Sequence, residues 1–287
     1  MKRRYSLLVL LVLILLLAVT GCESARNKPA TGEVTSVQVR VSGSGTCLPL
    51  LRILTDEYSA THKGVTFTYL PGLHSGGGIK GVANGDLELG AVSRELTDEE
   101  KDLDLEYYQL SDDGLVVAVH PTVVVDDIST EQVREIYSGK YDNWTQLGGP
   151  DLPMVILDRN EDESAKIILR KYVLGPDVEI TPKAVNLFYE PDMVDGLQKT
   201  PGAVGYFSLG LGLSRDIPVN YLKLDGVEAT VANIENGTYE MVRPLGVVAK
   251  RPVRQQIVDF LEWATGDEAA DLMQRKGFAP VLSPAGE

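Results

Sequence analysis

Residues 65–84 read VTFTYLPGLHSGGGIKGVAN, a β-type run that passes through a Ser/Gly loop into a helix-forming stretch. A helix that begins in Ser75-Gly-Gly offers bare backbone N–H groups and the positive end of its dipole. Glycine and serine also cluster in ordinary βα turns, where they satisfy turn and cap geometry. The loop is therefore a candidate anion-binding site, but taken alone it is a weak one.

The same design occurs earlier in the chain. Residues 37–46 read VQVRVSGSGT, and they lead into an apolar pattern of helical spacing at Leu50, Leu51, Leu54 and Tyr58. Two consecutive strand–glycine loop–helix units are more informative than either unit alone. They predict an α/β protein whose helix N-termini point toward one ligand.

Length and charge limit the possible functions. A chain of 287 residues can form one large domain or two smaller ones, each with its own core. Its 41 acidic and 27 basic residues give a formal charge of −14, which argues against nucleic acid as a partner and against binding to an anionic membrane surface. A small anion is still possible, because it senses nearby dipoles and arginines while distant charges are screened over about 8 Å.

The N-terminus is predicted to be a targeting segment. Basic residues 2–4 precede an apolar run at 7–19, and the run ends in Val-Thr-Gly-Cys22. This ending resembles a bacterial lipobox, in which the signal peptide is cut before a lipid-modified cysteine; a plain secretory signal is the alternative. The sequence thus predicts a signal peptide at 1–21, and a lipidated N-terminus with a flexible linker at 22–36.

Cysteine and histidine usage indicates neither a disulfide nor a metal. With Cys22 assigned to lipid, Cys47 is left without a partner, and a small buried core residue is its simplest interpretation. The three histidines, at positions 62, 74 and 120, are widely spaced. We therefore expect no metal and no cofactor.

Strands alternate with helices along the rest of the chain, which predicts mostly parallel sheets flanked by helices. Ser93-Arg94 follows the strand at 86–92, and Arg159 follows the strand at 154–157. Ligands of open α/β sheets bind at such carboxyl ends. Arg159 stands just before a helix, so its guanidinium is placed to donate two N–H groups to an oxyanion.

Six segments of the chain, taken in order, form a recognisable set. They are Gly43-Ser-Gly-Thr46 with Pro49, His74-Ser-Gly-Gly-Gly-Ile-Lys80, Glu88-Leu-Gly-Ala-Val-Ser-Arg-Glu95, Ile136-Tyr-Ser-Gly-Lys-Tyr-Asp-Asn-Trp144, Thr200-Pro-Gly-Ala-Val-Gly-Tyr206, and Asn236-Gly-Thr-Tyr239 with Arg243-Pro244. Together they resemble the phosphate-binding proteins of ABC transporters over nearly all of the mature chain. That resemblance implies a two-lobed type II periplasmic-binding fold with the anion in the cleft between the lobes. Lobe one would span 37–115 and 247–287, and lobe two would span 116–246.

The resemblance also implies a set of anion-binding residues. In lobe one they are Thr46 and Cys47 of the first loop, Ser75, Gly76 and Gly77 of the second, and Ser93 with Arg94.

Lobe two would add Arg159. The family follows this arginine with Gly-Ser-Gly-Thr, whereas this chain has Asn-Glu-Asp-Glu163-Ser164-Ala, so Ser164 matches only loosely. The Ser-Asp that the family often has after its Gly-Ala strand is here Ser93-Arg94, as in one branch of the family.

The function implied is that of a receptor, not an enzyme. It would be an extracytoplasmic, membrane-anchored lipoprotein that binds inorganic phosphate or a similar oxyanion and delivers it to ABC permease subunits. We expect a monomer that contacts the membrane only through its lipid and binds no nucleic acid. The alternatives are an anion-sensing lipoprotein without transport, and a dinucleotide-dependent enzyme, because Gly76, Gly78 and Gly81 match G-x-G-x-x-G.

Selectivity is a separate question. Hydrogen phosphate carries an O–H donor and sulfate carries none, so an ionised carboxylate in the cleft would separate the two anions. Glu163 is our candidate for that carboxylate. The alternative is an acid in the first helical turn that only complements the helix dipole.

Overall fold

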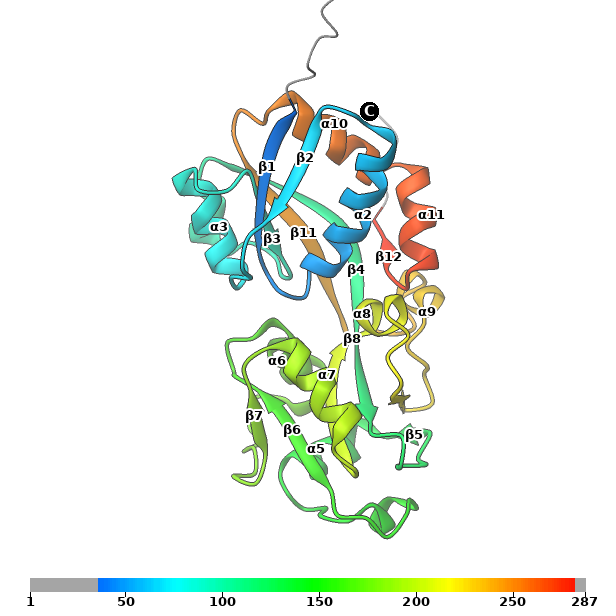
Figure 1. The fold of residues 1–287 in the computed structure, drawn as a ribbon. Coiled ribbons are helices and arrows are strands. Elements are labelled where there is room, and N and C mark those ends of the chain that lie inside the picture. Colours follow the sequence, from blue (N-terminus) through cyan, green and yellow to red (C-terminus); the bar gives the residue numbers. More distant parts are fainter. Residues whose placement is uncertain (1–35, 282–287) are drawn as a thin grey trace, which may run out of the picture. The chain divides into compact units, whose positions relative to one another are not determined.

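The computed structural model describes residues 36–281, and in this part of the chain the halves of the molecule are joined by two long strands. The expected signal peptide, lipobox and linker lie outside the described residues. The strands run in the order β2-β1-β3-β11-β4-β8-β6-β7, with β12 and β9 paired to β4. Figure 1 shows β4 running from one half into the other.

The first half is a sheet covered on both faces. Strand β1 pairs in parallel with β2 and β3. The strands are parallel because a helix follows β1 and another follows β2, and each helix returns the chain to the end of the sheet where the previous strand began. Its elements are β1 (Val37–Gly43), α2 (Leu48–Thr61), β2 (Val65–Tyr69), α3 (Ser75–Asn84), β3 (Leu89–Val92), α4 (Asp98–Lys101), α10 (Gln255–Ala264), α11 (Asp267–Arg275) and β12 (Ala279–Pro280).

Side-chain alternation along the strands divides the apolar residues of this half between the two faces. Val247 packs with α2, α10 and α11, and its neighbour Val248 packs with α3 on the opposite face. Both valines are fully buried. A continuous apolar run such as 245–249 therefore fits a strand covered by helices on both sides.

The second half has its own core, built around Trp144, Tyr137, Tyr206 and Phe207. Strand β6 pairs in parallel with β7 and β8. The elements are β5 (Asp127–Ile128), α5 (Thr130–Tyr137), η1 (Trp144–Leu147), β6 (Val155–Arg159), α6 (Ser164–Leu169), η2 (Arg170–Leu174), β7 (Val185–Leu187), α7 (Glu190–Lys199), β8 (Ala203–Ser208), α8 (Leu209–Ser214), β9 (Asn220–Tyr221), β10 (Lys223–Leu224) and α9 (Val231–Glu235).

The two halves meet along β4 (Leu105–Val119) and β11 (Val242–Lys250). These strands are antiparallel, with a register shift between Leu245 and Gly246. Residues 105–114 of β4 pair with β11, and residues 115–119 pair with β8. The predicted α/β class with parallel strands flanked by helices is confirmed, and the antiparallel pairs lie at the junction. The lobe ranges 37–115 with 247–287 and 116–246 remain a prediction.

No helix between residues 36 and 281 has the length and the apolar character that a membrane span requires.

Candidate functional site

A cavity of about 260 Å³ lies where the two halves meet. The first half contributes the loops after β1 and β3 and the start of α3. The second half contributes the segment from the end of β6 to the start of α6, and the start of α7. The lining residues are Ser44, Gly45, Thr46, His74, Ser75, Gly76, Ser93, Arg94, Arg159, Asp162, Glu163, Ser164, Tyr189, Glu190 and Pro191.

Hydroxyl groups from three loops converge at this cavity. Ser44 Oγ donates to Ser93 Oγ at 2.7 Å, and the backbone N–H of Ser93 donates to Ser75 Oγ at 3.2 Å. Ser93 Oγ in turn donates to Ser164 Oγ at 3.0 Å, a bond between the halves. Ser44, Ser75 and Ser93 are all buried. Hydroxyls can donate or accept, so this cluster can reorient its protons toward an anion.

The start of α3 adds backbone donors. The N-cap residue His74 makes no side-chain cap hydrogen bond, and Gly78 is the first residue whose N–H returns to His74 O. The N–H groups of residues 75–77 thus have no acceptor within the helix. A Cβ on Gly78 would lie 2.9 Å from Gly43 Cα and 3.0 Å from Ala91 O, so glycine lets this helix end approach the sheet closely.

Arg159 is the principal cation of the second half at this cavity. It ends β6, where its backbone N–H donates to Tyr206 Oη at 3.1 Å, and its side chain is 5 % exposed. Nη2 donates to Glu163 Oε2 at 2.8 Å and to Phe188 O at 3.1 Å. Nε is buried and has no partner among the described residues. A buried guanidinium with a free donor is a good oxyanion ligand.

Glu163 links the two halves electrostatically. Its Oε1 lies 3.1 Å from His74 Nδ1, while Oε2 accepts from Arg159. Both of its oxygens are therefore already in contact with cationic or potentially cationic groups.

A buried ion cluster borders the site at the crossing strands. Arg243, fully buried in β11, donates through Nε and Nη2 to Asp113 Oδ2 at 3.2 and 3.1 Å. Its Nη2 also donates to Glu190 Oε1 at 3.2 Å, and its Nη1 to Ser164 Oγ at 3.2 Å. Burial raises the pKa of the Asp113 carboxyl, and the charge of Arg243 opposes that shift. The cluster fixes the positions of Glu190 and Ser164 relative to β11.

The structure brings together most of the residues expected from the sequence. Thr46, Ser75, Gly76, Ser93, Arg94, Arg159, Glu163 and Ser164 line the cavity.

Two of the expected residues do not line it. The side chain of Cys47 is fully buried, with Sγ 3.3 Å from Gly246 O, and burial raises the pKa of its thiol to about 12. Its backbone N–H donates to Ser44 O. Gly77 lies one residue further along α3 than the lining residue Gly76.

Arg94 lines the cavity with its guanidinium already paired. Nη1 and Nη2 donate to the two carboxylate oxygens of Glu100 at 2.7 and 2.8 Å, and Nη1 also donates to Glu95 O. The Glu100 side chain holds the pKa of Arg94 above its usual value. Arg94 is thus less available to a ligand than Arg159.

Sequence reasoning missed several lining residues, of which Glu190 is the most important. Glu190 begins α7 directly before Pro191, and acids are common at helix starts, so its sequence position gave no specific signal. Ser44 and His74 stood in the quoted motifs without being assigned a role.

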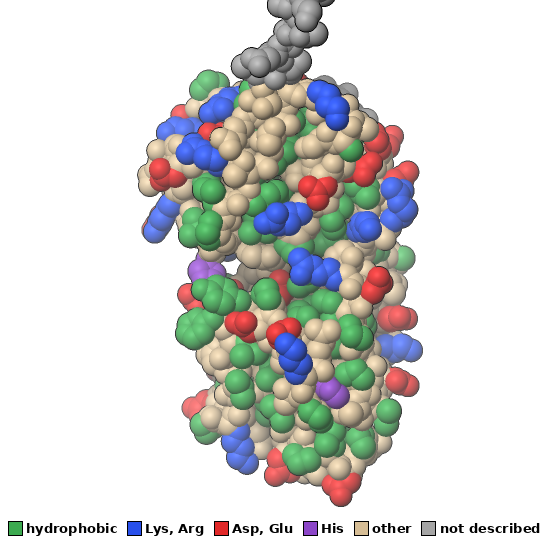
Figure 2. All heavy atoms as spheres, viewed as in Figure 1, with side chains coloured by type: hydrophobic (Ala, Val, Ile, Leu, Met, Phe, Trp, Pro, Cys, Tyr) green, Lys and Arg blue, Asp and Glu red, His purple; other side chains and the backbone are tan. Residues whose placement is uncertain are grey.

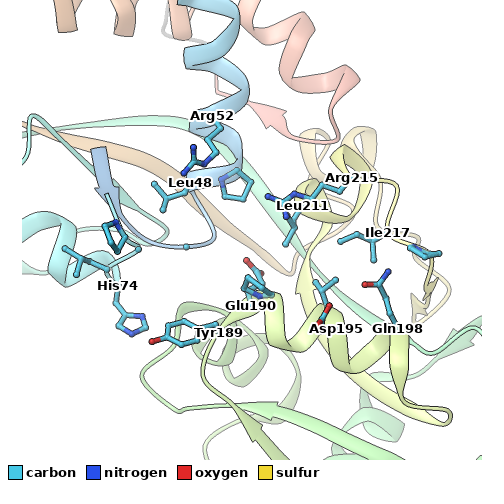
Figure 3. A pocket seen from close by; sticks show the side chains of 18 residues that line it. Leu48, Arg52, His74, Tyr189, Glu190, Asp195, Gln198, Leu211, Arg215 and Ile217 are labelled. Atoms are coloured by element: carbon cyan, nitrogen blue, oxygen red, sulfur yellow. The ribbon is translucent and has the colours of Figure 1, made fainter. Parts of the chain in front are cut away.

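A larger cavity of about 750 Å³ adjoins the first and shares Gly45, His74, Tyr189, Glu190 and Pro191 with it. Figure 3 shows side chains of α2, among them Leu48 and Arg52, on one side of it and side chains of α7, among them Asp195 and Gln198, on the other. Figure 2 shows a hollow between the halves on the same face, with acidic and basic side chains interspersed around it. The smaller, polar cavity therefore adjoins the larger cavity.

Packing accounts for two of the three glycines in the dinucleotide-like pattern. A Cβ on Gly81 would come within 2.7 Å of Leu87 Cδ1, and Gly78 faces the sheet backbone as described. Among residues 36–281, no three His, Cys, Asp or Glu side chains are grouped so that they could hold a metal ion.

Two cores joined by crossing strands, with helix starts and two arginines lining a shared polar cavity, define a ligand-binding protein of the periplasmic-binding class. A family model described as the PBP superfamily domain matches residues 28–268, and the chain belongs to that superfamily.

Relatives within this superfamily carry phosphate-binding names. The chain is 25% identical over 295 residues to the phosphate-binding protein PstS of Bacillus subtilis, covering 98% of this chain and 95% of that protein. It is 22% identical over 251 residues to PstS of Borreliella burgdorferi, covering 85% and 90%.

Among solved structures, one described as a phosphate ABC transporter substrate-binding protein from Clostridium perfringens, with bound phosphate, is 27% identical. It superimposes with a TM-score of 0.76 over 85% of this chain and 100% of that chain.

Proposed function

We propose that this chain is the substrate-binding receptor of an ABC importer, and that it binds inorganic phosphate or a similar tetrahedral oxyanion. The observation that supports this most directly is Arg159 Nε, which is buried at the cavity and has no hydrogen-bond partner among residues 36–281. A guanidinium only donates hydrogen bonds, so a bound anion would satisfy it. The names of the relatives from Bacillus subtilis and Clostridium perfringens favour the same ligand.

The proposed ligand sits between the halves and receives donors from both. Ser75, Ser93 and the N-terminal amides of α3 would approach from the first half, and Arg159 from the second. In this proposal the two halves are lobes, hinged at β4 and β11, that close on the anion. Closure excludes water and strengthens each charge-assisted hydrogen bond.

The family is a class of binding proteins rather than of enzymes, and the proposed role needs no catalytic step. Permease subunits would be the partners, and the receptor would act as a monomer. An anion sensor without transport would use the same site, and genes for permease and ATPase subunits beside its own would favour transport.

The experiment that tests the proposal is calorimetry of residues 23–287, which contain every described element, against phosphate, arsenate, sulfate and molybdate. Arg159→Ala should weaken phosphate binding by about thirtyfold to several thousandfold, because a charge-assisted contact is lost from a desolvated cleft. Arg254→Ala is the matched control, since Arg254 is 54% exposed and pairs with Glu88. Equal affinity of the Arg159→Ala variant and the parent would disprove the assignment.

We further propose that the protein is anchored outside the cytoplasm by lipid on Cys22, because the apolar run ends in Val-Thr-Gly-Cys22. Cys22→Ala should block processing or release the protein from the membrane fraction. A Cys22→Ala product that is cut and still sediments with membranes would contradict this.

A further inference from the structure

Three buried side-chain atoms lack a hydrogen-bond partner within residues 36–281, and two of them belong to one cavity. They are Tyr107 Oη, Arg159 Nε and Glu190 Oε2. Arg159 and Glu190 both line the 260 Å³ cavity, whereas Tyr107 does not. The residues Arg159 and Glu190 are only 5% and 4% exposed. A buried polar group without a partner is unfavourable, so two such atoms at one cavity indicate a ligand that pairs with both.

The two atoms have opposite hydrogen-bonding character. Arg159 Nε can only donate, and an ionised Glu190 Oε2 can only accept. The segment that carries Glu190 also lies beside Arg159, because Arg159 Nη2 donates to Phe188 O, two residues before Glu190. One ligand that satisfies both must therefore present an acceptor oxygen and an O–H donor. Hydrogen phosphate and hydrogen arsenate present both, whereas sulfate presents acceptors alone.

The surroundings of Glu190 hold its carboxylate in a fixed orientation. Oε1 accepts from the backbone N–H of Ser208 at 3.0 Å and from Arg243 Nη2 at 3.2 Å, which leaves Oε2 free. Arg243 is shared with Asp113, so one cation faces two carboxylates. A carboxylate that is ionised in this position favours a proton donor at Oε2 and repels an anion that has none.

Glu163 is less suited to this role, although it lies in the same cavity. Its Oε2 is taken by Arg159 Nη2 and its Oε1 by His74 Nδ1. Glu163 is thus placed to orient Arg159, whereas Glu190 Oε2 has no hydrogen-bond partner among residues 36–281.

We propose that Glu190 is the residue by which this receptor selects protonated tetrahedral oxyanions over sulfate. Its Oε2 accepts the ligand O–H while Arg159 Nε donates to another ligand oxygen. This inference rests on the proposed function and specifies its ligand class.

The first test compares anions by calorimetry at pH 7.5 for the parent, Glu190→Gln and Glu163→Gln, each as residues 23–287. In Glu190→Gln, an amide whose oxygen keeps the contacts of Oε1 directs its NH₂ into the cavity, so it repels the phosphate proton and donates to sulfate. The phosphate-to-sulfate affinity ratio should fall by about a hundredfold or more. Glu163→Gln should weaken the binding of both anions by a similar factor, because Arg159 loses the charged partner that orients it.

A second test changes the ligand and needs no variant. Monofluorophosphate is a tetrahedral dianion without an O–H near neutral pH, so the parent should bind it about thirtyfold or more weakly than hydrogen phosphate. Glu190→Gln should remove most of that difference. Equal binding of the two anions by the parent would overturn the proposal even if the variant failed to fold.

The outcomes separate this inference from the proposed function. A parent that binds none of the oxyanions disproves the receptor assignment. A parent that binds phosphate and sulfate equally, or a Glu190→Gln variant whose ratio changes less than about threefold, overturns the role of Glu190 and leaves the receptor standing. A collapsed ratio in Glu163→Gln alone would transfer the role to Glu163.

Discussion

The 260 Å³ cavity has two walls, the first supplied by the first half of the molecule and the second by the second half, and the two walls carry different chemical groups. The first half presents mainly neutral donors, namely the hydroxyls of Ser44, Ser75 and Ser93 and the first amides of α3, since its arginine at the cavity, Arg94, is paired with Glu100. The second half presents charges, Arg159 and Glu163 among them, together with Glu190. Neutral dipoles attract any anion, whereas charged groups of both signs distinguish one anion from another. In the proposed site the first wall would therefore supply donors that suit any oxyanion, whereas the second wall would supply both the strongest donor, Arg159, and the carboxylates that select among anions.

The walls are also held in place by different means. The first wall depends on close backbone approach, as where Gly78 lies against Gly43 and Ala91. The second wall depends on ion pairs, with Arg243 linking Asp113 and Glu190. Substitutions should therefore destabilise the two walls for different reasons.

The largest expected effect is on the ion cluster behind the second wall. Arg243→Leu leaves Asp113 and Glu190 buried without their cation, and it should lower the free energy of unfolding by about 3–5 kcal/mol. Urea denaturation measures this. Arg254→Leu, which breaks an exposed pair, should cost less than about 1 kcal/mol. Similar losses in both variants would contradict the view that buried pairing holds this wall.

A smaller effect is expected at the first wall. The Cβ of Gly78→Ala would press on the backbone of Gly43 and Ala91, so unfolding should become easier by about 1–3 kcal/mol. At Gly76 the nearest atom to a new Cβ is Arg94 Nη2 at 4.0 Å, and Gly76→Ala should be neutral or stabilising by up to about 1 kcal/mol. Thermal melts of the two variants compare them directly. If both are neutral, close packing does not fix this wall.

A third prediction concerns the contact between the walls. Ser164→Ala removes the acceptor of Ser93 Oγ and of Arg243 Nη1, a loss of about 0.5–1.5 kcal/mol in the closed state. Phosphate affinity should fall about two- to tenfold. Ser138→Ala, whose hydroxyl bonds Glu135 O elsewhere, is the control. Unchanged affinity in Ser164→Ala would mean that this bond does not support closure.

The smallest effect is expected at Arg94, the cation of the first wall that is already paired. Hydrogen bonds from Arg94 lower the pKa of Glu100 from 4.5 to about 2. Because the folded pKa is depressed, the stabilisation is present above pH 4.5 and is lost as the pH falls toward 2.

Glu100→Gln should lower the free energy of unfolding at neutral pH by about 1 kcal/mol or less, since the pair is partly exposed. The variant should also lose less stability than the parent as the pH falls from 4.5 toward 2. Urea midpoints between pH 2 and 6 test this. A parent and a variant with the same slope in that range would contradict it.

Local features of the fold were predictable from the sequence. Capping boxes at Thr97–Glu100 and Ser129–Gln132 begin α4 and α5, and such motifs can be read from the sequence because they satisfy helix N–H groups with residues three positions apart. The two glycine loops lead into α2 and α3 without a side-chain cap, and the strand–loop–helix pattern that predicted these helices is also local. Arg159 could be singled out because its position between a strand end and a helix start is itself local.

Short-range features of the sequence predict the class of protein, the helix starts that face the cavity, and the candidate arginine. These features depend on hydrogen bonds and side-chain periods within a few residues. Which carboxylate lacks a hydrogen-bond partner among residues 36–281 depends instead on contacts between distant residues. Arg243 reaches Asp113 across 130 positions, because the register of β4 and β11 places the two residues opposite each other, and it reaches Glu190 of α7 across 53. No local pattern encodes these long-range contacts. Glu163 therefore stands out in the sequence, whereas Glu190 is the buried carboxylate that has an oxygen without a hydrogen-bond partner among residues 36–281.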